Sequence, residues 1–271
     1  MAALSMNEMT TYRWSFEEDV AEYAAAGIPA IGVWRQKLSD FGEERGIELL
    51  ADSGLAVSNL LWVGGFTGSD GRSQRESIDD ASEALRVAAA LGADCLVAYS
   101  GARGGHTRNH ARRLVREALG ELLPQAAELG VPLAIEPMHE GCATEWTFLT
   151  SIEDALDLLS PFDEQSARLV FDTYHLGHDA TVIDRIGQYV QRIAVVHLGD
   201  GKTPPDGEQD RCCLGCGAVP LKEIVAALSD AGYQGYYDVE LMGEEIEACD
   251  YHQLIEQSKA AFNQLLSCHT L

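Results

Sequence analysis

The sequence predicts an α/β fold in the form of a single (β/α)₈ barrel, also called a TIM barrel, and three observations lead to this prediction. Short apolar stretches rich in β-branched residues alternate with longer amphipathic stretches, which is typical of parallel strands joined by helical crossovers. The strand-like stretches are apolar almost throughout, as expected when both faces of a sheet are buried. The length of 271 residues, 46% of them hydrophobic, suits eight such units in one domain over residues 1–271.

The expected elements follow one another in a regular order. A weak strand around residues 5–12 precedes a helix over 16–26. Seven clearer strands are expected at 28–34, 57–63, 95–100, 133–138, 168–172, 193–198 and 236–241. Helices follow them at 36–53, 73–91, 107–129, 152–159, 180–189, 221–231 and 250–266. Glycine directly after several of these helices is a natural terminator, and a long loop over 199–217 follows the seventh strand.

The charge balance excludes some kinds of partner. The chain has 43 acidic and 19 basic residues, a formal net charge of −24. Such a surface repels a phosphate backbone, so we expect no nucleic-acid partner. No apolar run reaches transmembrane length, so no membrane partner is expected either. The first residues lack a secretory signal pattern, which predicts a cytoplasmic protein.

The seven cysteines do not form a disulfide pattern, because their number is odd and their spacing does not repeat. Cys212, Cys213 and Cys216 stand close together in the manner of zinc ligands. No second Cys or His pair follows at zinc-finger spacing. We therefore expect reduced thiols rather than a structural zinc site.

Four ionisable residues end four consecutive predicted strands. Glu136 ends LAIEP, Asp172 ends LVFD, His197 ends AVVH and Glu240 ends YDVE. The active sites of parallel barrels lie at the carboxyl ends of the strands. The four side chains should therefore converge in one small volume.

Three carboxylates and one imidazole in one volume would destabilise each other without a cation, because like charges a few ångströms apart raise each other's pKa. A divalent ion removes that conflict. Three oxygen ligands and one nitrogen ligand suit Mn²⁺, Mg²⁺, Co²⁺ or Zn²⁺. We expect one such ion, with Mn²⁺ preferred for an oxygen-rich site.

The segments IEPMH, FDTYH, VVHLGD and DVELMG resemble those of the xylose-isomerase-like sugar isomerase and epimerase superfamily. Its members include ketose 3-epimerases, hydroxypyruvate isomerase, inosose isomerase and dehydratase, 3-dehydroshikimate dehydratase and endonuclease IV. The resemblance covers nearly the whole chain. It implies that Glu136, Asp172, His197 and Glu240 bind the metal, and that Glu136 and Glu240 form the acid/base pair. His175 then matches a substrate-binding histidine, or else it contacts the metal ligands and holds them in position.

The activity implied by the resemblance is isomerisation or epimerisation of a small ketose or related carbohydrate. The reaction would pass through a metal-stabilised enediolate, with two glutamates moving the proton. Members of the superfamily are often dimers or tetramers, so a homo-oligomer is expected.

The sequence also departs from the ketose 3-epimerases. Cys142 stands where they have a second glutamate, and Thr203 stands where they have an arginine. Their G-x-G motif with an acidic centre is here Gly215, Cys216 and Gly217. These differences leave open a lyase or dehydratase that acts on an inosose, a dehydroshikimate-like ring or a 3-keto-glycoside. More remote alternatives are a phosphodiesterase of the endonuclease IV type and a non-catalytic sugar-binding subunit.

Further residues are candidates for substrate contacts. Trp14, Trp34 and Trp62 fall near the carboxyl ends of the first three strands, where an aromatic ring either stacks on a sugar or packs the barrel rim. His106 follows a glycine-rich turn after the fourth strand. Arg211 lies in the long loop, where it either contacts substrate or is an exposed surface residue.

Overall fold

The strands of the computed structural model, which describes residues 3–143 and 145–267, form a closed barrel. They pair in sequential order and all in parallel, and β1 pairs with β8 to close the sheet. The predicted (β/α)₈ barrel is confirmed. The strands are β1 (Ala3–Asn7), β2 (Ala30–Trp34), β3 (Ala56–Gly64), β4 (Leu96–Tyr99), β5 (Leu133–Ile135), β6 (Ala167–Asp172), β7 (Ile193–Leu198) and β8 (Tyr236–Val239).

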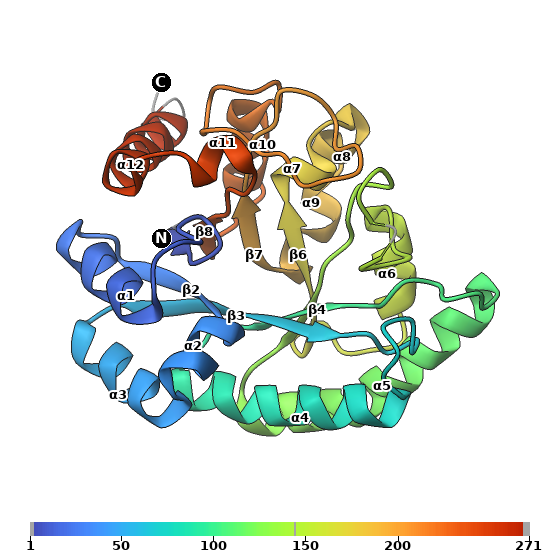
Figure 1. Cartoon of the computed structure of the whole chain (residues 1–271). Helices are drawn as coiled ribbons and strands as arrows, with labels where there is room; N and C mark the ends of the chain where they lie inside the picture. Colours follow the sequence, from blue (N-terminus) through green and yellow to red (C-terminus); the bar gives the residue numbers. More distant parts are fainter. Residues whose placement is uncertain (1–2, 144, 268–271) are drawn as a thin grey trace.

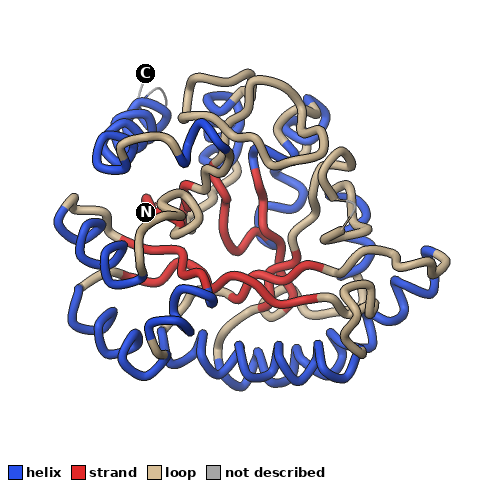
Figure 2. Tube along the Cα trace, viewed as in Figure 1, coloured by secondary structure: helices blue, strands red, loops and turns tan. Residues whose placement is uncertain are grey.

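The helices lie around the outside of the strands (Figures 1 and 2). The longer ones are α1 (Phe16–Ala25), α3 (Glu43–Ser53), α4 (Gln74–Leu91), α5 (Arg108–Leu129), α10 (Leu221–Asp230) and α12 (Tyr251–Ser267). The shorter ones are α2 (Arg35–Phe41), α6 (Ile152–Leu159), α7 (Thr173–Leu176), α8 (Ala180–Asp184), α9 (Ile186–Tyr189), η1 (Val190–Arg192) and α11 (Glu244–Glu247). None of the described helices is both long and apolar enough to cross a membrane.

Local chemistry explains where several helices start and stop. Ser15 and Ser73 each begin a helix with a capping box, in which a glutamate three residues later completes the pair of hydrogen bonds. Gly92 and Gly130 end α4 and α5 in the left-handed conformation, which glycine adopts without a steric cost.

Some predicted elements differ from the structure. The expected helix over 36–53 is two helices, because Gly42 has φ +107° and no helical conformation. The expected helix over 180–189 is broken at Arg185. The first strand lies at Ala3–Asn7 instead of 5–12, because the chain turns after Asn7, whose carbonyl accepts a hydrogen bond from the Thr10 amide.

The barrel interior has its own small core, separate from the large core beneath the helices. Its buried members are Leu61, Cys95, Val97, Ala134, Val170, Ala194 and Val195. Polar groups also lie in the interior: Asn7 of the neighbouring strand β1 and Asn59 of β3 donate hydrogen bonds to Asp238 of β8, at 2.7 and 2.8 Å. A Cβ at Gly32 would collide with the Asp238 carboxylate, so only glycine fits there.

Candidate metal centre

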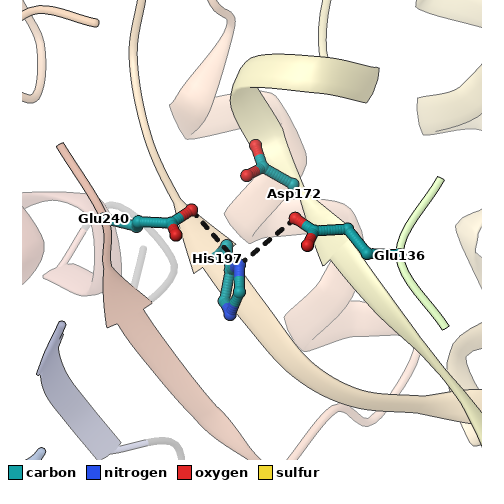
Figure 3. Close-up of side chains that lie close together, drawn as sticks. All are labelled: Glu136, Asp172, His197 and Glu240. Carbon is teal, nitrogen blue, oxygen red and sulfur yellow. Dashed lines mark ion pairs between the residues drawn. The ribbon is translucent and has the colours of Figure 1, made fainter. Parts of the chain in front are cut away.

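Four ionisable side chains meet above this interior core, at the carboxyl ends of β5 to β8 (Figure 3). Glu136 directly follows β5, Asp172 ends β6, His197 is the last residue but one of β7, and Glu240 directly follows β8. Each offers one ligand atom, and these atoms lie within 4.8 Å of one another. All four residues are at most 2% exposed. The geometry therefore brings together the four residues that the strand ends predicted.

The imidazole of His197 lies between the two glutamates. Its Nδ1 atom is 3.4 Å from Glu136 Oε1 and 3.3 Å from Glu240 Oε2 (Figure 3). Both ring nitrogens are buried, and neither has a hydrogen-bond partner among the described residues. Buried polar atoms rarely lack a partner in native proteins. The two unpartnered nitrogens therefore indicate that a further group, such as a metal ion, can bind beside the ring.

The charges within this four-residue cluster shift its pKa values in opposite directions. Burial raises the pKa of Glu136. Burial acts in the same direction on Glu240, but the positive charges of Arg211 and His197 outweigh it and hold the Glu240 pKa at about 2. The pKa of His197 is raised well above its usual value because the charges of Glu240 and Glu136 outweigh the effect of burial. The three carboxylates of the cluster thus concentrate negative charge, which Arg211 and His197 compensate in part.

The donor set fits a divalent metal ion. Three carboxylates and one imidazole, buried and converging, can provide oxygen and nitrogen ligands from four separate strands. Among the described residues, no other group of His, Cys, Asp and Glu atoms gathers in this way.

Asp172 is fixed by its neighbours on both oxygens. Its Oδ1 atom accepts hydrogen bonds from the amides of Tyr174, at 2.7 Å, and His175, at 3.1 Å. This cap starts the short helix α7, which was not predicted from the sequence. Its Oδ2 atom accepts a hydrogen bond from Arg211 at 2.9 Å.

Arg211 is buried against the cluster, with 1% of its surface exposed, so the alternative of a surface arginine is wrong. Besides Asp172, its guanidinium lies 3.1 Å from Glu240 Oε2 and donates to the Glu240 carbonyl at 3.0 Å. It also lies over the Tyr174 ring. These contacts hold two of the three clustered carboxylates, while the predicted substrate contact of Arg211 stays a prediction.

His175 lies beside the cluster. Its Nδ1 atom is 3.4 Å from the Cys142 sulfur, and its Nε2 atom is buried with no hydrogen-bond partner among the described residues. Burial lowers its pKa to about 4, so the ring is neutral at neutral pH. A cavity of about 340 Å³ opens next to it, with His139 and His178 in its lining.

Trp34 and Trp62 line a second cavity, of about 350 Å³, with Tyr99 and Trp146. Trp14 and His106 are not in the lining of this second cavity. Trp14 packs its ring against Tyr251 and His252 of α12. His106 forms a hydrogen bond with the Thr67 carbonyl, and its ring packs on that of His110. Neither of these contacts involves the four clustered residues.

The family model described as "Xylose isomerase-like TIM barrel" matches residues 20–265. The chain belongs to this family. An inosose isomerase of Bacillus velezensis is 22% identical over 217 residues, 79% of this chain and 75% of that protein. A D-psicose 3-epimerase of Enterocloster bolteae is 32% identical over 124 residues, 45% of this chain and 37% of that protein.

Solved structures of similar proteins share the fold. Protein SMc04130 of Sinorhizobium meliloti has a TM-score of 0.90 and 29% identity, with 97% of this chain and 98% of that chain covered. The IolI protein, solved with a zinc atom bound, has a TM-score of 0.85 and 21% identity, with 98% and 99% covered. At that identity, the likeness to IolI shows the shared fold.

In this xylose-isomerase-like barrel, Asp200 organises the long loop after β7 and was missed from the sequence. Its two carboxylate oxygens accept hydrogen bonds from the amides of Gly201, Gly215, Gly217 and Val219. A Cβ at Gly217 would collide with that carboxylate. The loop that carries Arg211 is therefore tied down at its base. The sequence signal for this role was the position of the aspartate, which directly follows Gly199 in the segment VVHLGD.

Tyr99 and Trp146 were also missed. Tyr99 ends β4 in the same way that Trp34 ends β2, so its place at a strand end was readable. Trp146 lies in the loop between β5 and α6, where no periodic pattern indicates which way a side chain points.

Proposed function

We propose that this protein is a divalent-metal-dependent isomerase or epimerase of a small ketose or related carbohydrate. The observation that carries the proposal is the buried cluster of Glu136, Asp172, His197 and Glu240 at the mouth of the barrel. The relatives named as inosose isomerase and D-psicose 3-epimerase support the class of reaction.

The four clustered residues would hold the ion. Mn²⁺ is our preferred ion, because three of the four ligands are carboxylates, while the zinc atom bound to the IolI protein keeps Zn²⁺ among the candidates. When bound, a divalent ion would supply the positive charge that acidifies a C–H group beside a carbonyl and stabilises the enediolate that forms.

The placement of the two glutamates suits proton transfer. Glu136 and Glu240 follow strands that are not neighbours in the barrel, and their carboxylates flank the His197 imidazole. A substrate carbon between them could lose a proton to one carboxylate and receive one from the other. Return to the opposite face of the same carbon gives an epimer, and return to the adjacent carbon gives an isomer.

A lyase or dehydratase is the second candidate. The observation that favours it is Cys142, whose sulfur faces His175 where ketose 3-epimerases have a glutamate. In this reaction the same deprotonated carbon would expel a substituent from the next carbon, instead of recovering the proton.

The test is proton exchange with solvent. The Mn²⁺-loaded protein is incubated in D₂O with ketoses, inososes and 3-keto-glycosides, and proton NMR follows each compound. We expect deuterium at the carbon beside the carbonyl together with a new stereocentre or a shifted carbonyl. A new double bond or a released substituent would establish the lyase instead. Stoichiometric metal without exchange in any compound would overturn the proposal.

A further inference from the structure

The mouth of the barrel has an aromatic half as well as an ionisable half. Trp34 comes two residues after Gly32, which faces Asp238 in the interior, and Tyr99 comes two residues after Val97 of the interior core. Side chains alternate along a strand, so Trp34 and Tyr99 lie on the interior face at the mouth. Glu136 has the same relation to Ala134 on β5. Strands β2 and β4 thus place aromatic rings where β5 to β8 place the cluster.

These rings form a groove that continues outward from the barrel interior. The cavity of about 350 Å³ is lined by Leu61, Trp62, Tyr99 and Trp146 among others. Leu61 belongs to the interior core and Trp62 packs against it. That core also contains Ala134 and Val195, two residues before Glu136 and His197, so the groove and the four-residue cluster lie over the same interior core.

Part of this aromatic surface is open to solvent. Trp146 is 42% exposed, although its ring is only 5.5 Å from that of Tyr99 and 6.1 Å from that of Trp62. Tyr12, stacked on Trp34 at 5.7 Å, is 49% exposed. Exposed aromatic clusters of this kind mark binding surfaces more often than isolated apolar residues do.

The groove also has a fixed wall and polar groups. The Arg35 guanidinium donates to the Trp62 carbonyl at 3.2 Å and pairs with Asp80 at 2.9 Å, so the backbone beside the ring is held in place. The Trp62 Nε1 donor is buried without a hydrogen-bond partner among the described residues. Gln36 and Ser39 add hydrogen-bonding groups to the lining.

We infer that this groove binds a second sugar ring, joined to the ring that reacts at the four-residue cluster, so that the substrate class is a glycoside or disaccharide. The inference rests on the proposed function. A sugar ring has apolar C–H faces that pack on aromatic rings and hydroxyl groups that need polar partners. The groove offers both, and its volume lies within the usual range for small-ligand sites, about 300–1,000 Å³.

The test compares the affinities of disaccharides with those of their own monosaccharides. Maltose, cellobiose, lactose and sucrose, with glucose, galactose and fructose, are titrated into the Mn²⁺-loaded protein, and isothermal titration calorimetry measures each affinity. We expect at least one disaccharide to bind roughly tenfold more tightly than either of its component sugars, the scale of one well-packed ring. Equal affinities throughout the panel would overturn the inference.

Two variants locate the effect. Trp146→Ala removes an exposed ring and should abolish the preference for the disaccharide. Leu129→Ala is the control, because Leu129 is an exposed apolar side chain at the end of α5, and it should keep the preference. A preference that survives in Trp146→Ala would overturn the inference.

The outcomes separate this inference from the proposed function. Deuterium exchange of a free ketose without any disaccharide preference would leave the proposed function standing and overturn the second-ring site. A disaccharide preference without exchange would support the second-ring site and overturn the proposed function. Phenyl glucoside completes the panel: if it gains affinity and no disaccharide does, the groove takes an aromatic group and the inference is wrong.

Discussion

At the scale of single residues, the neighbours of each clustered carboxylate determine what it can do. Arg211 pairs with both Asp172 and Glu240, while Glu136 has the His197 ring as its charged neighbour. The guanidinium compensates part of the buried negative charge before any ion binds. Breaking a buried ion pair is costly, so Arg211 should stay in place during the reaction.

Glu240→Gln should separate proton transfer from metal binding. The glutamine keeps an oxygen that can face the ion, but it cannot take up a proton. We expect solvent deuterium exchange to fall by a factor of about 10²–10⁴, the usual contribution of a general base, while most of the bound Mn²⁺ remains. Glu244→Gln, in the exposed first turn of α11, is the control and should exchange at the original rate. Unreduced exchange in Glu240→Gln would remove Glu240 from the acid/base pair.

At the scale of elements, the loop after β7 joins the cluster to the outer helices. Asp200 accepts hydrogen bonds from four backbone amides of this loop, and its carbonyl accepts one from Cys212, directly after Arg211. The carboxylate therefore supports the position of Arg211 from a distance.

Asp200→Asn should loosen that loop. The side-chain oxygen of asparagine still accepts hydrogen bonds but its NH2 group cannot, so two of the four backbone amides lose their partner, at a cost of about 2 kcal/mol. We expect faster hydrogen exchange at residues 211–219, measured by mass spectrometry, and weaker Mn²⁺ binding. Asp206→Asn, at an exposed position of the same loop, is the control. Unchanged exchange in Asp200→Asn would show that the loop is held by other contacts.

A buried ionic network fixes the loop between β1 and α1. Lys37 of α2 is 7% exposed, pairs with Asp19 at 2.6 Å, and donates to the carbonyls of Glu8 and Thr11. This loop carries Tyr12, one of the exposed rings at the mouth. The network thus links the packing of α1 and α2 to the shape of the aromatic groove.

Lys37→Met should therefore lower the free energy of unfolding by about 3–5 kcal/mol, because Asp19 would remain buried without its cation. Urea denaturation followed by circular dichroism would measure the change. Lys222→Met, at an exposed position of α10, should change stability by less than about 0.5 kcal/mol. A loss of similar size in both variants would refute this role of Lys37.

Elements whose pattern is local could be predicted from the sequence, and those that depend on distant partners could not. Seven strands follow from continuous apolar runs. The first strand was misplaced, because its polar residues Ser5 and Asn7 find their partners on β3 and β8. Gly42 breaks a helix whose periodicity looks continuous. The helix α7 exists because the Asp172 side chain caps it, which no periodic pattern reveals.

The candidate site divides in the same way. Its four clustered residues were predictable because parallel strands bring their carboxyl ends together. The buried position of Arg211 and the roles of Trp146 and Asp200 depend on how long loops fold over the mouth. Loop conformation follows from tertiary contacts rather than from a repeating pattern, so these residues became clear only in the structure.

At the scale of the whole molecule, metal binding and folding should be coupled. The four clustered residues come from the ends of β5, β6, β7 and β8, which are spread over residues 133–240, so the unfolded chain does not bring them together. An ion that binds only the folded state stabilises it by about 2.7 kcal/mol at a hundred times its Kd. The net charge of −24 adds self-repulsion to the metal-free protein.

Saturating Mn²⁺ should therefore raise the melting temperature of the metal-free protein by about 5–10 °C, since 1 kcal/mol corresponds to about 2–4 °C in a domain of this size. Differential scanning calorimetry with and without a chelator measures the shift. His197→Ala should lose it, because the variant lacks one of the four ligands, whereas His252→Ala, on the exposed face of α12, should keep it. An equal shift in His197→Ala would place the ion elsewhere, and the thiols of Cys212, Cys213 and Cys216 would be the next ligands to remove.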